Sequence, residues 1–213
     1  MTGTPPPRYR LIAFDLDGTL VDSFPFFLAN MDDLARTHGF RAFASADIER
    51  LRHLGSRELL RHARLPWWKL PRVARDFRTR MASATGIPLF DGMADALAAL
   101  HAEGATLALV TSNSEASARA HLGERIFRLF HHVECGIGLF GKASRLRRLA
   151  CRADARGAAL YVGDELRDAD AAQAAGFAFG AVAWGYTHRA ALEATRPAWL
   201  FERPRELTRL ARP

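Results

Sequence analysis

Asp15 and Asp17 are the side chains of this sequence best suited to chemistry, because they come directly after a largely apolar run at residues 10–14. Alternate residues of an extended chain point to the same face, so the two carboxylates are predicted to lie side by side. One could act as a nucleophile while the other carries a proton. Gly18 then lets the chain turn sharply and leaves room for an anion. Because Asp-Gly is also a common turn signal, this pair needs support from other parts of the chain.

A second apolar run, Thr106–Val110, is also followed by polar residues, namely Thr111, Ser112 and Asn113. Hydroxyls and backbone N–H groups at the start of a helix can bind an anion. The same residues are also an ordinary helix-capping sequence. Their position after a strand favours a site.

Lys142 is one of only two lysines in the chain, and it stands at the predicted start of a helix within GLFGKA, residues 138–143. A cation at this end of a helix opposes the helix dipole. Its position therefore indicates a role other than helix stability. A solvated surface lysine is the alternative interpretation.

Two acidic residues, Asp164 and Asp168, follow a third apolar run at residues 158–162. Side chains four residues apart lie on one face of a helical turn, where carboxylates can converge on a hard cation. Asp164 is predicted to bind the cation directly, and Asp168 to bind it through water or to orient Lys142. Glu165 lies off that face.

These polar residues must be positioned by strands that alternate with helices. The predicted strands are residues 10–14, 106–110, 158–162 and 179–183, and the predicted helices between them are residues 93–103, 114–122, 142–153 and 168–175. Alternation of this kind indicates right-handed crossovers and an α/β fold with a doubly wound, Rossmann-like parallel sheet. Ligands of such sheets bind at the carboxyl ends of the strands.

Residues 22–88 interrupt the alternation, since they hold several helical patterns and no convincing strand before Ile87. The predicted helices are residues 24–37, 46–54, 56–63 and 71–84. We therefore expect a small all-helical cap at residues 22–88, inserted into a core domain formed by residues 1–21 and 89–213.

The stretch DLDGTLVDS, residues 15–23, resembles the first motif of the haloacid dehalogenase-like (HAD) hydrolases, in their phosphoglycolate phosphatase-like branch. GDELRD, residues 163–168, is similar to the GDxxxD pattern of that family. These two motifs, the Thr111 motif between them and Lys142 occur along the chain in the family's order. The resemblance implies that Asp15 is the nucleophile, Asp17 the general acid/base and Thr111 a ligand of the phosphoryl oxygens. It also implies that Lys142 neutralises Asp15 and the phosphoryl charge.

The resemblance also implies a Mg²⁺ cofactor and a phosphate-binding set. The expected metal-binding residues are Asp15, Asp17, Asp164 and Asp168, and the expected phosphate-binding residues are Gly18, Ser112, Asn113 and, from the cap, Arg57. The cap resembles the family's first cap class, which limits the site to small molecules.

The sequence thus predicts a magnesium-dependent phosphatase that hydrolyses a small, phosphoglycolate-like phosphate monoester through an aspartyl-phosphate intermediate. Two alternatives stay open. A sugar phosphomutase of the same superfamily would use the same catalytic residues, and a catalytically silent binding module could share the fold.

Composition limits the partners. Hydrophobic residues form 49% of the chain and charged residues 25%, as in an ordered globular protein. The net charge of +7 is spread along the chain, so we expect no nucleic-acid partner. No signal peptide and no apolar run of ~20 residues is found, so a cytoplasmic location without a membrane partner is expected. The expected partner is a small phosphorylated molecule, bound by a monomer or homodimer.

Overall fold

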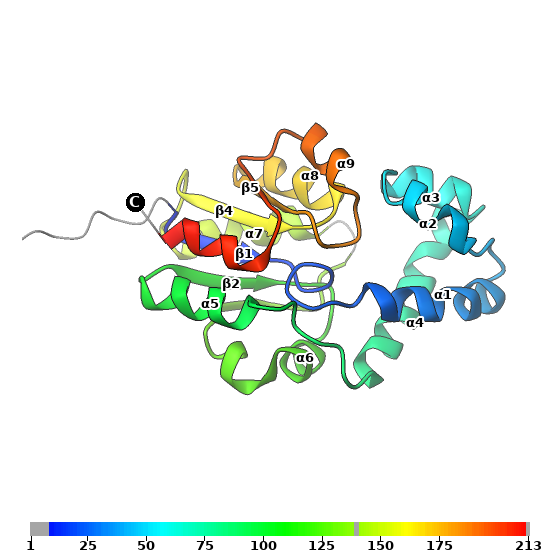
Figure 1. Cartoon of the computed structure of the whole chain (residues 1–213), viewed down its shortest axis with the longest axis horizontal. Helices are drawn as coiled ribbons and strands as arrows, with labels where there is room; N and C mark the ends of the chain where they lie inside the picture. The colour runs from blue at the N-terminus through cyan, green and yellow to red at the C-terminus, as the bar shows by residue number, and fades with distance from the viewer. Residues whose placement is uncertain (1–8, 139–140, 212–213) are drawn as a thin grey trace, which may run out of the picture.

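A computed structural model describes residues 9–138 and 141–211 of the chain. Its centre is one sheet of six parallel strands in the order β3-β2-β1-β4-β5-β6 (Figure 1). The strands are β1 (Leu11–Phe14), β2 (Thr106–Val110), β3 (His132–Glu134), β4 (Ala159–Gly163), β5 (Ala178–Val182) and β6 (Trp199–Phe201). The predicted α/β fold with a parallel, Rossmann-like sheet is confirmed.

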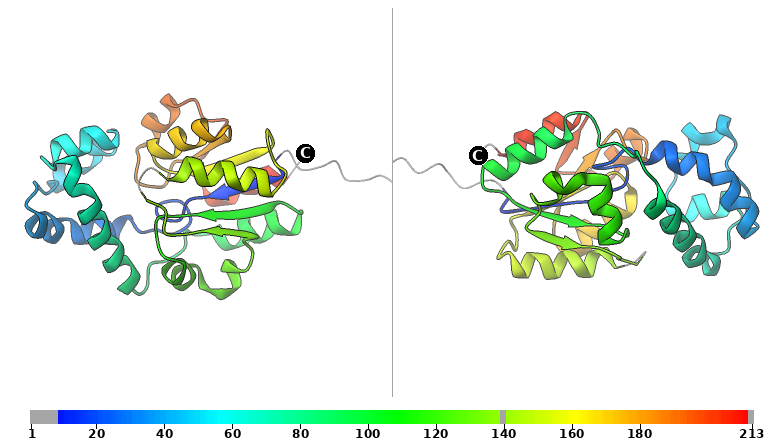
Figure 2. Two further views of the ribbon diagram at one scale, coloured as in Figure 1. Left: turned by 180° about the vertical axis from the view of Figure 1, so that it is seen from behind. Right: turned by 90° about the horizontal axis from the view of Figure 1, so that it is seen from below.

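The central strands are apolar on both faces because helices cover both faces. One face packs against α5 (Met93–Ala102), α6 (Glu115–Phe127) and the 3₁₀ helix η3 (Pro204–Ala211), and the other against α7 (Lys142–Arg152), α8 (Leu166–Ala175) and α9 (Arg189–Ala194) (Figure 2). Phe14 and Leu97 belong to the first hydrophobic cluster, and Tyr161 and Leu149 to the second. All four side chains are fully buried.

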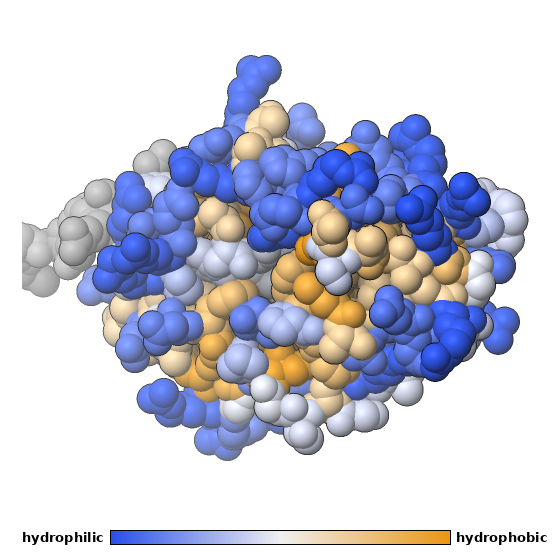
Figure 3. Space-filling model, turned by 45° about the vertical axis from the view of Figure 1, so that its right-hand side comes forward, coloured by the Kyte–Doolittle hydropathy of each residue, from blue (hydrophilic) through white to orange (hydrophobic). Residues whose placement is uncertain are grey.

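Residues 22–88, here called the helical segment, lie at one end of the molecule, beside the sheet and its covering helices (Figure 1). Its helices are α1 (Phe24–His38), η1 (Ser45–Asp47), α2 (Ile48–Leu51), α3 (Ser56–His62), η2 (Trp67–Lys69) and α4 (Leu70–Ser83). Trp67 and Trp68 of η2 are exposed and add nothing to the core. In Figure 3 hydrophilic residues cover most of one side of the molecule, while apolar residues gather near its centre.

Both ends of the helical segment meet at one place. The backbone N–H of Asp22 donates to the carbonyl oxygen of Pro88 over 2.8 Å. The neighbouring residues Val21 and Leu89 form an antiparallel bridge. The chain therefore leaves the sheet-forming part and returns to it at a single crossing.

Several boundaries differ from the sequence-based expectation. The single helix predicted for residues 46–54 is instead η1 followed by the four-residue helix α2, after which the chain turns into Gly55 with extended backbone. Helix α6 continues to Phe127 through a kink at Gly123, whose φ is 73°. The sequence analysis does not predict β3, β6, α9, η2 or η3. Within the described residues, no helix is long and apolar enough to cross a membrane.

Candidate active site

Asp15 stands at the carboxyl end of β1, where its backbone N–H donates to the carbonyl of Val162 on β4. Its carboxylate is buried, and Oδ2 accepts a hydrogen bond of 2.7 Å from Nζ of Lys142, the first residue of α7. Burial raises the pKa of Asp15 to about 7, although the charge of Lys142 acts in the opposite direction. The structure thus brings Asp15 and Lys142 into direct contact.

Lys142 also bonds to Asp168. Its Nζ lies 2.7 Å from Oδ1 of that residue, which is fully buried on α8. Burial lowers the pKa of Lys142, but the charges of Asp15 and Asp168 outweigh burial and raise this pKa above its usual value. The amine is therefore protonated throughout the neutral range. Leu139 and Phe140, in the stretch before Lys142, lie outside the described residues.

Asp168 has further donors on both carboxylate oxygens. The hydroxyl of Tyr161 donates to Oδ1 over 3.2 Å, and the backbone N–H of Glu165 donates to Oδ2 over 3.1 Å. Burial raises the pKa of Asp168, but Lys142 and Arg167 outweigh it, and the pKa lies below its usual value. These bonds fix Asp168 as an ionised group that holds the lysine.

Asp164 is surrounded by neutral donors. The hydroxyl of Thr19 donates to Oδ1 over 2.9 Å, and the backbone N–H of Tyr186 donates to Oδ2 over 2.7 Å. Burial raises the pKa of Asp164 well above its usual value, and the charges of Glu165 and other carboxylates add to the effect. Asp164 therefore lacks a cationic hydrogen-bond donor among the described residues.

The carboxylates of Asp15, Asp164 and Asp168 form a cluster, since one ligand atom of each lies within 4.8 Å of the others. All three are buried, and Lys142 supplies the one ammonium in contact with the cluster within the described part of the chain. Buried like charges are costly unless a cation compensates them. Carboxylate oxygens are ligands that Mg²⁺ prefers, so this donor set fits a divalent cation.

Asp17 lies outside that cluster and contacts the second predicted motif. Its Oδ2 accepts a hydrogen bond of 3.0 Å from the side-chain amide of Asn113, whose backbone N–H donates to Oγ1 of Thr111 over 3.1 Å. Burial raises the pKa of Asp17. Its Oδ1 is buried without a hydrogen-bond partner among the described residues. A carboxyl group with a raised pKa and a free oxygen is suited to carrying a proton.

Gly18 packs against the cluster, as expected for a residue chosen for its small size. Its φ is +71°, and an added Cβ would lie 2.3 Å from Oδ2 of Asp164. Gly163 and Gly185 are similarly close to Asp168 and Asp164, where a Cβ would lie within 2.6 Å and 2.3 Å of their side chains. Three glycines therefore pack directly against the carboxylates, at positions where any larger side chain would collide with Asp164 or Asp168.

The two remaining predicted residues are less closely connected. Arg57 is exposed on α3, and neither its side chain nor that of Ser112 forms a hydrogen bond within residues 9–138 and 141–211. Arg57 is thus not joined to the carboxylate cluster. Asp15, Asp17, Lys142, Asp164, Asp168, Thr111, Asn113 and Gly18 are the predicted residues that the structure brings together at the ends of β1, β2 and β4.

The sequence analysis assigns no role to Thr19, Tyr161 or Tyr186, all of which contact the cluster or its ligands. Thr19 could have been predicted from the sequence, since it lies within the first motif, residues 15–23. Tyr161 lies near the carboxyl end of β4, a position that is typical of site residues in parallel sheets. Tyr186 acts through its backbone N–H, which residue type does not indicate.

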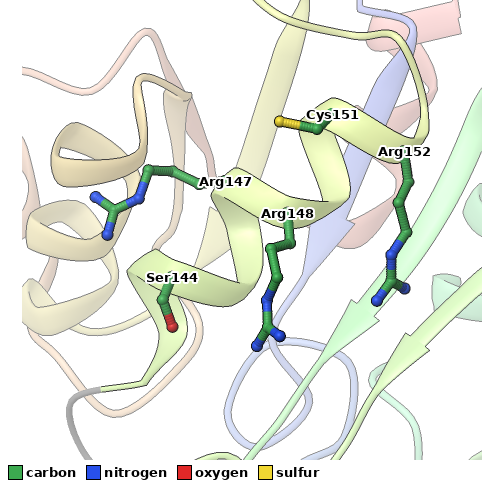
Figure 4. A pocket seen from close by; sticks show the side chains of 5 residues that line it. All are labelled: Ser144, Arg147, Arg148, Cys151 and Arg152. Carbon is green, nitrogen blue, oxygen red and sulfur yellow. The ribbon is translucent and has the colours of Figure 1, made fainter.

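A second set of polar side chains projects from the exposed side of α7 (Figure 4). Ser144, Arg147, Arg148, Cys151 and Arg152 line an open depression of about 420 Å³ there. Arg147 donates to the carbonyl of Ala174, and Arg152 donates to Glu134. These residues are exposed, whereas Lys142 is buried at the start of the same helix.

The family model of haloacid dehalogenase-like hydrolases matches residues 12–182, which is most of the chain. The chain belongs to the haloacid dehalogenase-like hydrolases. A phosphoglycolate phosphatase of Synechococcus elongatus is 36% identical over 201 residues, covering 93% of this chain and 95% of the relative. A phosphoglycolate phosphatase of Xanthomonas campestris is 32% identical over 190 residues, covering 83% of this chain and 84% of the relative.

Solved structures of this HAD family share the whole fold. A haloacid dehalogenase-like protein of Streptococcus pneumoniae has a TM-score of 0.74 at 20% identity, covering 94% of this chain and 97% of its own. CbbY of Rhodobacter sphaeroides, solved in complex with phosphate, has a TM-score of 0.65 at 26% identity, covering 93% of this chain and 96% of its own. The predicted HAD fold and the predicted enzyme class, a phosphatase, are confirmed.

Proposed function

We propose that this HAD hydrolase is a magnesium-dependent phosphatase that cleaves a small, phosphoglycolate-like phosphate monoester through an aspartyl phosphate on Asp15. The observation that carries the proposal is the contact of Lys142 with Asp15, within a buried cluster of three carboxylates. Phosphate monoesters resist attack because their anionic oxygens repel a nucleophile, so a site for them must neutralise charge and align the attack.

In the first step, the free oxygen of Asp15 attacks phosphorus in line, and the bond from phosphorus to the leaving oxygen breaks. Asp17 gives its proton to that oxygen, which its raised pKa favours. The alcohol product leaves, and the phosphoryl group stays on Asp15 as an acyl phosphate.

In the second step, ionised Asp17 takes a proton from a water molecule as that water attacks phosphorus. The bond between phosphorus and Asp15 breaks, inorganic phosphate is released and the Asp15 carboxylate is restored. Lys142 keeps its proton through both steps, since the adjacent carboxylates raise its pKa. Its ammonium offsets charge on Asp15 and on the transferred group.

Asp15 and Asp164 would hold Mg²⁺, which supplies positive charge to the phosphoryl oxygens when bound. Asp168 accepts hydrogen bonds from Lys142, Tyr161 and a backbone N–H, so we assign it to holding Lys142. Asp17, also predicted as a ligand, lies outside the carboxylate cluster, and we assign it the proton transfers.

Thr111, Ser112, Asn113 and Gly18 would bind the phosphoryl oxygens, because they stand at or beside the strand ends that carry Asp15 and Asp17. The helical segment would act as the cap that selects the substrate and excludes water. Arg57 would enter the site only when substrate is bound, since its exposed position leaves it free to move. A cytoplasmic location and a monomeric or homodimeric state stay predictions.

The relatives support the proposed substrate class, since several of them are phosphoglycolate phosphatases. The test is a phosphate-release screen over small organic phosphates, including 2-phosphoglycolate and sugar phosphates, with Mg²⁺ or with EDTA. We expect release that EDTA abolishes and added Mg²⁺ restores. An isomeric phosphate formed without inorganic phosphate would favour the phosphomutase, and no reaction across the panel would favour a binding module.

The matched variant is Asp15→Asn, which keeps the size of the side chain but removes the nucleophile. It should fold normally and lose turnover completely. Release of inorganic phosphate by this variant at the wild-type rate would rule out the covalent mechanism.

A further inference from the structure

Arg52, the residue after α2, reaches from the helical segment to the sheet-forming part of the molecule. Its Nε donates to the carbonyl oxygen of Tyr186 over 3.0 Å, and its Nη2 donates to that of Gly185 over 2.8 Å. Both acceptors lie on the loop between β5 and α9, residues 183–188. Arg52 therefore binds the backbone of this loop at two successive carbonyl groups.

The loop at residues 183–188, which Arg52 binds, also holds the side chain of Asp164. The backbone N–H of Tyr186 donates to Oδ2 of Asp164 over 2.7 Å. Gly185 lies against the same side chain, since a Cβ there would be 2.3 Å from the Cβ of Asp164. A displacement of this loop would therefore move the Asp164 carboxylate or lengthen its hydrogen bond to Tyr186.

Other contacts hold the two parts together at the same place. The backbone N–H of His188 donates to the carbonyl of Arg52 over 2.8 Å, and the rings of His188 and His53 stack with centroids 3.9 Å apart. The ring of Tyr186 packs edge-on against Phe24 of α1, with centroids 5.1 Å apart. Arg52 is thus at the centre of an interface between the helical segment and this loop.

The chemistry of the side chain suits this role. The third nitrogen of Arg52, Nη1, donates to Glu49 over 3.2 Å, so the guanidinium is held from the helical segment while its other two nitrogens face the loop. The side chain is only 21% exposed. A lysine could not hold three acceptors in one plane in this way.

We propose that Arg52 is a positioning residue that latches the helical segment onto the loop at residues 183–188 and thereby holds Asp164 in place to bind a divalent cation. The inference rests on the proposed function, because it treats Asp164 as a metal ligand. Cap position and metal binding are coupled through one hydrogen-bonded chain, Arg52 to Tyr186 to Asp164. Groups that orient a metal ligand typically change metal affinity or activity by 10–100-fold when they are removed.

The test measures Mg²⁺ affinity without substrate, by calorimetric titration of the full-length protein and its variants. Arg52→Ala should bind Mg²⁺ about 10-fold more weakly than the wild type, and Arg52→Lys should fall between them. The matched control is Arg50→Ala, because Arg50 is exposed and bonds only to half-buried Asp47 on its own stretch of chain, 3.0 Å away. It should bind Mg²⁺ as the wild type does.

A second readout separates positioning from a loss of folding. At saturating substrate, the activity of Arg52→Ala should recover when the Mg²⁺ concentration is raised about 10-fold, and circular dichroism should show an unchanged fold. If Arg52→Ala does not fold, Arg52→Lys carries the test, since it keeps the charge and most of the packing.

Three outcomes decide the matter. Weaker Mg²⁺ binding in the Arg52 variants alone supports the latch. Equal Mg²⁺ binding in the wild type and both Arg52 variants overturns it while the phosphatase function stands. A wild-type protein that neither binds Mg²⁺ nor releases phosphate overturns the proposed function as well.

Discussion

Nζ of Lys142 lies 2.7 Å from Oδ2 of Asp15, although 127 residues separate them in sequence. Both side chains are buried, so this is an ion pair in a low-dielectric setting. Asp15 follows the end of β1, and Lys142 is the first residue of α7. The two residues lie next to one another because the carboxyl ends of parallel strands, and the helices that follow them, meet at one edge of the sheet. The pair depends on the fold as a whole, and removing the ammonium of Lys142 should affect both stability and activity.

Lys142→Met should lower activity by at least ~100-fold, because it removes the ammonium that neutralises the transferred group. It should also lower the free energy of unfolding by about 3 kcal/mol without added Mg²⁺, since two buried carboxylates lose their counter-ion. Urea unfolding and phosphate release measure the two effects. Lys69→Met is the control, because Lys69, the other lysine, is exposed and donates only to a backbone carbonyl. Equal effects from both substitutions would contradict the assigned role.

Asp164→Asn and Asp168→Asn should separate two roles within the carboxylate cluster. Asp164 is held by neutral donors, so its substitution should weaken Mg²⁺ binding by at least ~10-fold in calorimetry. Asp168 bonds to Lys142, so its substitution should reduce turnover by ~100-fold while Mg²⁺ affinity changes by less than about threefold. Were Asp168→Asn to weaken Mg²⁺ binding as strongly as Asp164→Asn, Asp168 would be a metal ligand after all.

Gly18→Ala should inactivate the enzyme, because the new methyl group would meet Asp164 at 2.3 Å and the ring of Tyr186 at 2.4 Å. Gly86→Ala is the matched control. Gly86 has a φ of +78°, close to the +71° of Gly18, but nothing lies within 4 Å of its added Cβ. Backbone strain alone should cost the control about 1 kcal/mol and leave kcat unchanged. Comparable loss of kcat in both variants would mean that strain, not contact with Asp164, is the cause.

Asp76→Asn should change how stability depends on pH. Hydrogen bonds from Arg80 and His38 hold the pKa of Asp76 below its usual value. A lowered pKa stabilises the folded state above pH 3.8, the ordinary value, and this gain is lost as the pH falls through the lower folded-state pKa. The variant should therefore be about 1 kcal/mol less stable at pH 7, a difference that shrinks below pH 3.8.

Urea unfolding between pH 7 and pH 3 measures this difference. Asp32→Asn, at an exposed position of the neighbouring helix α1, should leave stability unchanged. A loss in Asp76→Asn that is the same at every pH would show that packing, and not charge, is responsible.

Much of the site could be predicted because polar residues stood at the tips of apolar runs. Asp15, Asp164 and Asp168 follow such runs, whereas Lys142 is distinguished by the scarcity of lysine and its position at a helix start; the structure joins all four through hydrogen bonds or a shared cluster. Strand tips of a parallel sheet converge, so position after a strand contained most of the information.

Other parts of the structure have no such signal. Strands β3 and β6 have three residues each, too few for a periodic pattern to be distinct from chance. The hydrogen bond from Tyr186 to Asp164 uses a backbone N–H, which every residue except proline has. Arg52 is one of many arginines in the helical segment. Only its contact with the distant loop at residues 183–188 distinguishes it from Arg50, which bonds to nearby Asp47.

The hydrogen bond between Asp22 and Pro88, 2.8 Å long, brings the two ends of the helical segment together. A transplant of residues 22–88 from a relative would therefore need to match this short junction and the contacts of Arg52, His53 and Phe24 with residues 183–188, and the strand order would be untouched. Chimeras built there would keep the strand ends that carry Asp15 and Asp164 while exchanging the segment that we propose selects the substrate. New specificities could arise in this scaffold by swapping a module, without rebuilding its chemistry.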